Sequence, residues 1–243
     1  MIFLSHGSIA STNEEAKRLY RDKRQVPITV TAREQTAGKG RNQRKWSSPV
    51  DKGIYLSYAN TAETVSGLAF RLMLISSLAA AETILSFIKC PGLKIKWPND
   101  ILINGKKVCG ILNEGIIIEK KSLYVMGIGI NVKKHQNPGP EYAQRYEYLE
   151  RYAEKELSIG DMASVLADRI ICREKRSRLS MLAEYRKLLY RPDHDIQIVR
   201  PGNKKVLTGR VIDIDDEGRL QFISGGTLLS LNSAELLQNE PLL

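Results

Sequence analysis

The segment 67–88 constrains the fold more than any other, because it is apolar around its whole circumference. Its apolar side chains occupy every angular position of a helix: Leu68, Phe70, Leu72, Leu74, Ile75, Leu78, Ala79, Ala81, Ile84 and Leu85. A helix without a polar stripe must be buried on all sides. Arg71 and Glu82 interrupt the apolar run, so we expect no membrane span. The segment therefore predicts a core helix packed against a sheet.

Strand-like segments flank this helix in the sequence. β-Branched and alternating patterns mark residues 2–4, 28–33, 53–58, 93–97, 101–103, 107–118 and 123–131 as strands. The Asn104-Gly105 pair between two of them is typical of a tight hairpin. We expect one helix from Ser11 or Thr12 to about Lys23, and one long helix over residues 158–189. The pattern predicts an α+β fold, with a mixed, largely antiparallel sheet flanked by helices.

The pattern changes near residue 191, where Arg191-Pro192-Asp193 ends the last predicted helix. Short strands with turn signals follow, and roughly fifty residues of such strands are typical of a small barrel. We therefore expect two domains, a main one over residues 1–190 and a small C-terminal barrel over residues 191–243.

Composition limits the cellular setting and leaves the class of partner open. The chain has 243 residues with 37 Lys and Arg against 27 Asp and Glu, a formal net charge of +10. Such a charge fits nucleic acid, an acidic protein or anionic small molecules, and its spread along the chain selects none of them. Three widely spaced cysteines, with no signal-peptide pattern at the N-terminus, predict a cytoplasmic protein.

A basic loop over residues 34–46 is the first candidate site. It carries Lys39, Arg41, Arg44 and Lys45 around two glycines. Glycine lets backbone N–H groups turn toward an anion, and arginine offers a planar fork for phosphate or carboxylate. Taken alone, the loop is more typical of an ordinary solvated surface, so its function depends on the rest of the chain.

The second candidate is Lys96-Trp97-Pro98-Asn99-Asp100, where a predicted strand ends in a turn. An unpaired ammonium buried there would be unstable, so we expect an anion opposite Lys96. The alternative is a strand lysine that extends to solvent, and spacing alone does not separate Lys96 from Lys94. Cys109 lies inside an apolar strand and is more typical of a packed side chain than of a nucleophile.

These segments together resemble the biotin protein ligase family. Four features match in order: Ser11-Thr12-Asn13 at a helix start, Gly38-Lys39-Gly40-Arg41 with Arg44-Lys45-Trp46 in the loop, Lys96-Trp97-Pro98-Asn99-Asp100, and Lys107 with Gly110-Ile111-Leu112 paired with Gly127-Ile128-Gly129-Ile130-Asn131. Lys39 stands where the family more often has arginine, and Gln43 where it has glycine. We expect no DNA-binding winged helix, because the matching pattern begins close to Met1.

The resemblance implies an enzyme that attaches biotin to a lysine of an apo biotin carboxyl carrier protein through biotinyl-5′-AMP, with ATP and Mg²⁺. It implies a class II synthetase-like ligase domain and an SH3-like C-terminal barrel. The implied catalytic residues are Lys96 and Arg41. The implied biotin contacts are Ser11, Thr12, Asn13, Gln35, Gly38, Lys39, Gly40, Arg41, Lys96 and Gly110. The implied ATP contacts are Lys39, Arg41, Trp46, Lys96 and Asn131. Asp100 is the candidate Mg²⁺ ligand. The resemblance is compatible with a homodimer and implies no DNA or membrane partner.

Alternatives stay open beside this reading. A lipoate ligase or octanoyltransferase shares the fold, although the Lys96 segment and the basic loop favour biotin. A basic nucleic-acid-binding protein fits the charge, but the sequence has no recognition helix or aromatic platform for it. A carrier-binding module without catalysis would leave Lys96 without a task.

Overall fold

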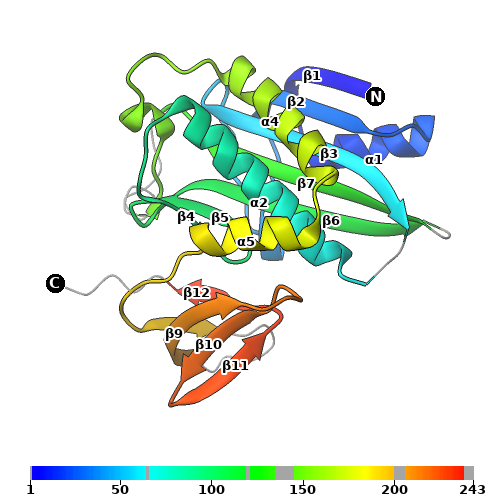
Figure 1. Ribbon diagram of the computed structural model, residues 1–243. Helices are drawn as coiled ribbons and strands as arrows, with labels where there is room; N and C mark the ends of the chain where they lie inside the picture. Colours follow the sequence, from blue (N-terminus) through cyan, green and yellow to red (C-terminus); the bar gives the residue numbers. More distant parts are fainter. Residues whose placement is uncertain (1, 64–65, 119–120, 135–144, 200–205, 238–243) are drawn as a thin grey trace.

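The computed structural model of the chain describes residues 2–63, 66–118, 121–134, 145–199 and 206–237 (Figure 1). Its main layer is a seven-stranded sheet with the strand order β1-β2-β3-β7-β6-β5-β4. The strands are β1 (Ile2–Ile9), β2 (Ile28–Gln35), β3 (Gly53–Glu63), β4 (Leu93–Lys96), β5 (Asp100–Ile103), β6 (Lys106–Ile118) and β7 (Lys121–Asn131). Among them β1 and β2 pair in parallel, and the other neighbours pair antiparallel. The predicted mixed, largely antiparallel sheet is confirmed.

Helices cover both faces of this sheet (Figure 1). They are α1 (Thr12–Lys23), α2 (Leu68–Phe87), α4 (Ile159–Glu174) and α5 (Arg178–Leu188), with short 3₁₀ helices η1 (Arg41–Gln43) and η2 (Leu149–Tyr152). On one face, Ala16 of α1 packs in a cluster with Leu123 and Val125 of β7. Tyr124 and Met126 of β7 belong to the larger core beneath α2, α4 and α5. Because strand side chains alternate between faces, β7 serves both cores.

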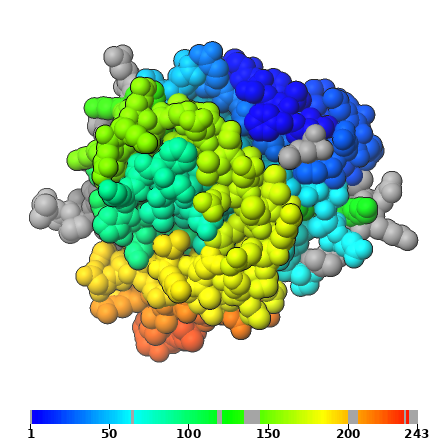
Figure 2. Space-filling model, turned by 45° about the horizontal axis from the view of Figure 1, so that its top comes forward, coloured from blue at the N-terminus to red at the C-terminus, as the bar shows by residue number. Residues whose placement is uncertain are grey.

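α2 is the predicted core helix. Leu74, Ala79 and Ile84 are fully buried. In Figure 2 the teal surface of α2 is flanked by the yellow-green and yellow residues of α4 and α5. The length of α2 and its mean hydropathy of 1.6 also suit a membrane span, but 67% of that stretch is buried inside the protein. Packing between the sheet and the other helices therefore accounts for its apolar surface.

The prediction of one long helix over residues 158–189 is wrong, because the structure has two helices there. Ser177 interrupts the run: its side chain accepts a hydrogen bond from the backbone N–H of Ser180 at 3.2 Å and so begins α5. The break lets buried Arg173 of α4 bridge Glu82 of α2 and Glu184 of α5. Apolar residues resume at helical spacing beyond the break, which is why the periodicity did not reveal it.

The C-terminal residues form a second sheet with the order β11-β10-β9-β8-β12. Its strands are β8 (Ile196–Val199), β9 (Val206–Ile214), β10 (Leu220–Ser224), β11 (Thr227–Leu231) and β12 (Glu235–Leu237). Leu220 and Phe222 of β10 are fully buried. Within the described residues, β11 and β12 end this sheet without pairing with each other, so the closed SH3-like barrel stays a prediction.

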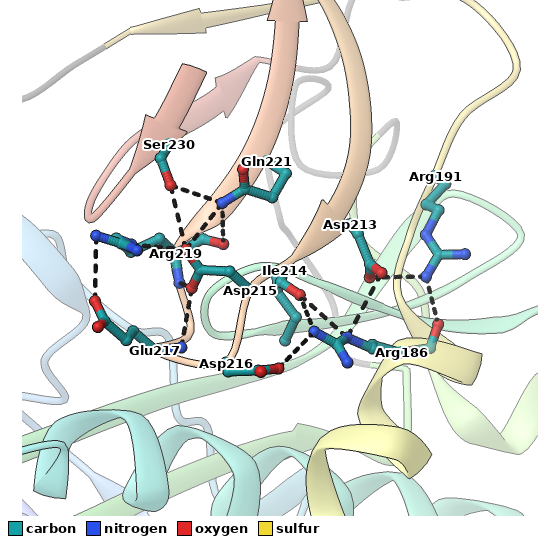
Figure 3. A network of polar contacts seen from close by, with 10 residues as sticks. All are labelled: Arg186, Arg191, Asp213, Ile214, Asp215, Asp216, Glu217, Arg219, Gln221 and Ser230. Carbon is teal, nitrogen blue, oxygen red and sulfur yellow. Dashed lines mark hydrogen bonds and ion pairs between the residues drawn. The ribbon is translucent and has the colours of Figure 1, made fainter. Parts of the chain in front are cut away.

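A polar network joins the second sheet to α5 and the segment after it (Figure 3). The Arg186 guanidinium donates to the carbonyl oxygen of Ile214 at 2.7 Å and to Asp216 at 3.0 Å. Arg191 donates to Asp213 at 3.0 Å. The two sheets are therefore held together by specific contacts as well as by chain connectivity.

Trp97 adds a contact between the second sheet and the main sheet. Its indole Nε1 donates to the carbonyl oxygen of Gly218 at 3.0 Å. A Cβ on Gly218 would come within 2.2 Å of Phe70, so the β9–β10 turn lies directly against α2. The turn at residues 97–99, which follows β4, is thus supported from the C-terminal sheet.

Candidate functional site

One cavity opens on the α1 face of the main sheet, within the described part of the chain. It is lined by Ser11, Thr12, Asn13, Gln35, Lys39, Gly40, Arg41, Trp46, Tyr55, Leu56, Asn99, Lys107, Gly110, Ile111, Leu112, Gly127, Ile128 and Gly129. Cross-strand register explains its floor, since Gly110 of β6 pairs with Gly129 of β7, and Leu112 pairs with Gly127. Both β7 glycines lie on the same face as Val125, which packs against α1. Without glycine side chains, this part of the sheet leaves room for groups above it.

Uncharged polar side chains form a hydrogen-bonded cluster in the cavity wall. Thr12 donates to Gln35 Oε1 from its backbone N–H, at 2.9 Å, and from its hydroxyl, at 3.1 Å. The Gln35 amide nitrogen donates to Ser48 Oγ at 2.9 Å, which fixes the orientation of that amide. Ser57 contacts both Asn13 Oδ1 and, at 2.7 Å, Thr12 Oγ1. Most of these groups are buried, so losing one partner would cost ~1–3 kcal/mol.

The basic loop folds back on itself as a small hairpin. The backbone N–H of Gly40 donates to the Arg44 carbonyl at 2.7 Å, and that of Trp46 to the Gly38 carbonyl at 2.9 Å. The turn between them includes Gln43 with a φ of 58°. This left-handed region favours glycine, so the residue that departs from the family pattern also holds a strained backbone position.

Two cations of the loop are held by groups outside it. Lys39 donates to Glu14 of α1 at 2.9 Å. This hydrogen bond lowers the pKa of the Glu14 carboxyl and raises the pKa of the Lys39 ammonium. Arg41 donates to Asn99 Oδ1 at 3.0 Å and reaches Ser233 Oγ at 3.5 Å. The loop is therefore anchored on α1, on the turn after β4 and on the connection between β11 and β12.

Lys107 of β6 is a third cation in the cavity wall, and Trp46 lies beside it. Lys107 Nζ is 5.2 Å from the centroid of a Trp46 ring and 2.7 Å from Asp100 Oδ1. A Cβ on Gly110 would come within 2.6 Å of the indole, and one on Gly129 within 2.5 Å. These two glycines therefore create the space that Trp46 fills.

The structure gathers most of the predicted contact residues around this cavity. They are Ser11, Thr12, Asn13, Gln35, Lys39, Gly40, Arg41, Trp46 and Gly110. The predicted residues that do not line it are Gly38, Lys96, Asp100 and Asn131. Gly38 faces the returning side of the loop, where a Cβ would be 2.5 Å from the Trp46 carbonyl oxygen. Asn131 donates instead to the carbonyl oxygen of Glu147 at 3.3 Å.

Lys96 lies at the end of the edge strand β4, where it pairs with Asp100. Because Lys96 does not line the cavity, the cavity gives no support to its predicted catalytic role. Lys107 lines the cavity, although the sequence singled it out only as part of a strand motif. Strict alternation would set Lys107 and Gly110 on opposite faces of β6. The pairing of β5 with β6 shifts register between these positions, and the Lys107 side chain lies 3.2 Å from the Cβ position of Gly110. Such a β-bulge is not readable from residue spacing.

Substitution of Gly129 by alanine tests the position of Trp46. The new Cβ would lie 2.5 Å from Trp46 Nε1, so the indole must move out of the cavity wall. We expect a changed tryptophan emission spectrum and a loss of ~1–3 kcal/mol in the free energy of unfolding from overpacking.

The matched control is Gly115→Ala in β6, where a Cβ would meet no atom within 4 Å. This control should leave emission and unfolding unchanged. An emission spectrum unaltered in Gly129→Ala would contradict the position of Trp46.

Comparison with known proteins gives a consistent relationship. Residues 7–131 match the model of the biotin/lipoate A/B protein ligase family. The chain is 31% identical over 241 residues to the bifunctional ligase/repressor BirA of Bacillus subtilis, covering 95% of this chain and 72% of that protein. It is 29% identical over 224 residues to the biotin–[acetyl-CoA-carboxylase] ligase of Mycobacterium tuberculosis, covering 86% of this chain and 78% of that protein.

Solved structures share the fold. The biotin protein ligase from Aquifex aeolicus, in complex with biotin and ATP, aligns with a TM-score of 0.80 at 22% identity over 98% of this chain and 99% of that one. The biotin protein ligase from Leishmania major, in complex with biotinyl-5-AMP, aligns with a TM-score of 0.67 at 21% identity over 96% of this chain and 99% of that one. The fold, the family model and the Bacillus relative agree, and the chain therefore belongs to the biotin/lipoate A/B protein ligase family of enzymes.

Proposed function

We propose that this chain attaches biotin to a lysine of a biotin carboxyl carrier protein, using ATP and forming biotinyl-5′-AMP on the way. The observation that carries the proposal is that one cavity is lined both by a cluster of uncharged hydrogen-bonding groups and by the cations Lys39, Arg41 and Lys107. The reaction must bring together an uncharged polar ring, a carboxylate and a triphosphate. The complex of the Aquifex protein with biotin and ATP supports this pair of substrates.

The uncharged cluster is the proposed site of the biotin ring. Thr12, Asn13 and Gln35 contribute oxygen atoms that can accept hydrogen bonds from a ureido ring. Leu112 lies in the same wall, on the face of β6 that carries Gly110, and can pack against the hydrocarbon chain of biotin. The biotin contacts predicted at the start of α1 and at the end of β2 keep that role in the proposal.

The cations would offset the repulsion between the two anionic reactants. At an effective dielectric constant near 20, like charges about 4 Å apart repel by roughly 4 kcal/mol. Lys39 and Arg41 can bind phosphate oxygens, and each charged hydrogen bond contributes about 1.5–3 kcal/mol. Trp46 offers an aromatic surface to the adenine ring in the same wall.

Lys107 is our candidate for the lysine between the two anions, in place of Lys96. In the proposed first step, a carboxylate oxygen of biotin attacks the α-phosphorus of ATP and pyrophosphate leaves. In the second step, the amine of the carrier lysine attacks the acyl carbon and AMP leaves. Lys107 lines the cavity beside Trp46, where its ammonium can pair with the negative charge that develops in both steps.

Mg²⁺ would enter with ATP. This ion prefers oxygen ligands and is commonly held by one or two carboxylates together with substrate phosphates. Asp100 stays the candidate ligand from the sequence, although its carboxylate lies outside the cavity lining and is paired with Lys107 at 2.7 Å. The described residues contain no group of three or more His, Cys, Asp or Glu side chains that could hold a metal, so phosphate oxygens would supply further ligands. When bound, the ion would neutralise part of the phosphate charge.

The carrier protein would approach along the open edge of β6. β5 pairs with β6 over residues 106–110, and the described residues place no strand beside the rest of that edge. An exposed strand edge can pair with another chain. The carrier domain, or a second copy in a homodimer, fits this edge. The proposal sets the reaction in the cytoplasm and includes no DNA or membrane partner.

Incubation with ATP, Mg²⁺ and biotin tests the proposal. We expect biotinyl-5′-AMP and pyrophosphate, detected by mass spectrometry after acid quenching. Parallel incubations omit biotin or replace it with lipoate. Lipoyl-AMP without biotinyl-AMP would favour the lipoate ligase alternative, and the absence of any adenylate would reject the proposed reaction.

The two candidate lysines can be separated by substitution. We expect Lys107→Ala to slow biotinyl-AMP formation by roughly 10²–10³-fold, as when a transition-state hydrogen-bond donor is lost, and Lys96→Ala to slow it by less than about ten-fold. Single-turnover pyrophosphate release gives both rates. The reverse ranking would return the catalytic role to Lys96.

A further inference from the structure

A charged pair behind the cavity fixes the orientation of a side chain in its wall. Lys17 of α1 is 8% exposed, and its Nζ donates to Glu114 Oε1 of β6 at 2.8 Å. The other carboxylate oxygen, Glu114 Oε2, accepts a hydrogen bond from Asn13 Nδ2 at 2.7 Å. Neither Lys17 nor Glu114 lines the cavity, whereas Asn13 does.

The orientation of the Asn13 amide follows from its partners. A carboxylate accepts hydrogen bonds and cannot donate them, so the NH₂ half of Asn13 must face Glu114. The carbonyl oxygen of Leu112, 3.4 Å from Asn13 Nδ2, is a second acceptor on that side. The amide oxygen therefore faces the other way, toward the Ser57 hydroxyl. Gly127 leaves room for it, because a Cβ there would lie 2.2 Å from Asn13 Oδ1.

This orientation makes the cluster rich in acceptors. Gln35 is fixed in the same sense, since its nitrogen donates to Ser48 and its oxygen faces Thr12. The hydroxyls of Thr12 and Ser57 carry one hydrogen each, whereas every oxygen offers two lone pairs. The cluster thus has more acceptor sites than hydrogens to fill them, and a ligand with N–H groups would satisfy the remainder.

We propose that Glu114 and Lys17 are positioning residues that select a ligand with N–H donors by holding the Asn13 amide oxygen toward the cluster. The inference rests on the proposed function and deepens it. If the proposed function holds, Glu114 and Lys17 favour binding of the ureido ring of biotin over a ring without N–H groups, such as the dithiolane of lipoate. Both residues act through Asn13 and do not touch the ligand.

Glu114→Gln should reverse this arrangement with little change in volume. Lys17 binds one carboxylate oxygen and Asn13 the other. If Lys17 keeps the remaining oxygen of the glutamine, the new NH₂ group faces Asn13 and forces its amide to turn over. The cluster then gains donors, and we expect biotin to bind at least about ten-fold more weakly.

A compensating substitution separates this role from a merely structural one. Asn13→Asp alone sets two carboxylates against each other and should also weaken biotin binding by at least about ten-fold. In Asn13→Asp/Glu114→Gln, the glutamine NH₂ donates to one aspartate oxygen, and Ser57 can donate to the other. We expect the double variant to recover biotin affinity to within about three-fold of the parent protein, which additive losses would not allow.

Isothermal titration measures the biotin affinity of the parent protein, the two single variants and the double variant. Thermal unfolding confirms that each is folded. Glu15→Gln is the control for loss of a carboxylate, because Glu15 pairs with Arg18 on the same helix outside the cavity. Glu114→Gln with unchanged affinity would overturn the inference, as would a double variant as weak as the product of the single losses. No biotin binding by the parent protein would instead contradict the proposed function.

Discussion

The apolar surface of α2 decides which face of the main sheet can carry a polar site. Because α2 has no polar stripe, the sheet, α4 and α5 must enclose it, and one face of the sheet becomes a continuous core. α1 covers part of the opposite face through Ala16 and Leu19. Next to the start of α1, the basic loop covers the same face of the sheet, and the cavity lies between the loop, the start of α1 and the sheet. Gly110, Gly127 and Gly129 make room here: Trp46 and Asn13 occupy the space that larger side chains at these positions would fill.

The contacts that hold the basic loop are suited to exchange for a ligand. The Lys39–Glu14 pair is about half exposed, and exposed ion pairs contribute only ~0–1 kcal/mol. Arg41 binds the uncharged Asn99 amide and the Ser233 hydroxyl. Phosphate oxygens offer charged hydrogen bonds, which are roughly twice as strong as neutral ones. Under the proposed function, both cations would move from these partners to ATP, and the loop would then shield the mixed anhydride from water.

The parts of the molecule that could be predicted from sequence depend on local patterns. The all-round apolar run and the Asn104-Gly105 hairpin each fix a conformation within a few residues. The start of α1 was also found at Ser11 and Thr12, although the Ser11 side chain makes no capping hydrogen bond. The cavity residues of α1 and the loop came from a resemblance carried by several motifs together. Lys107 was missed as a cavity residue because a β-bulge sets its face, and spacing could not separate Lys96 from Lys94. The helix break at Ser177 carries a local cap that the continuing apolar periodicity hides. The lack of pairing between β11 and β12 in the described residues depends on tertiary contacts that no short pattern encodes.

The account depends most on the claim that the uncharged cluster around Thr12 and Gln35 accepts hydrogen bonds from a ureido ring. Calorimetric titration of the parent protein with biotin, and separately with lipoate, tests this claim directly. The two acids share a valeryl chain and carboxylate, so their difference in affinity reports the ring. The account predicts clear heat and saturable binding with biotin and at least about ten-fold weaker binding with lipoate. Equal affinity for the two acids, or tighter binding of lipoate, would contradict it.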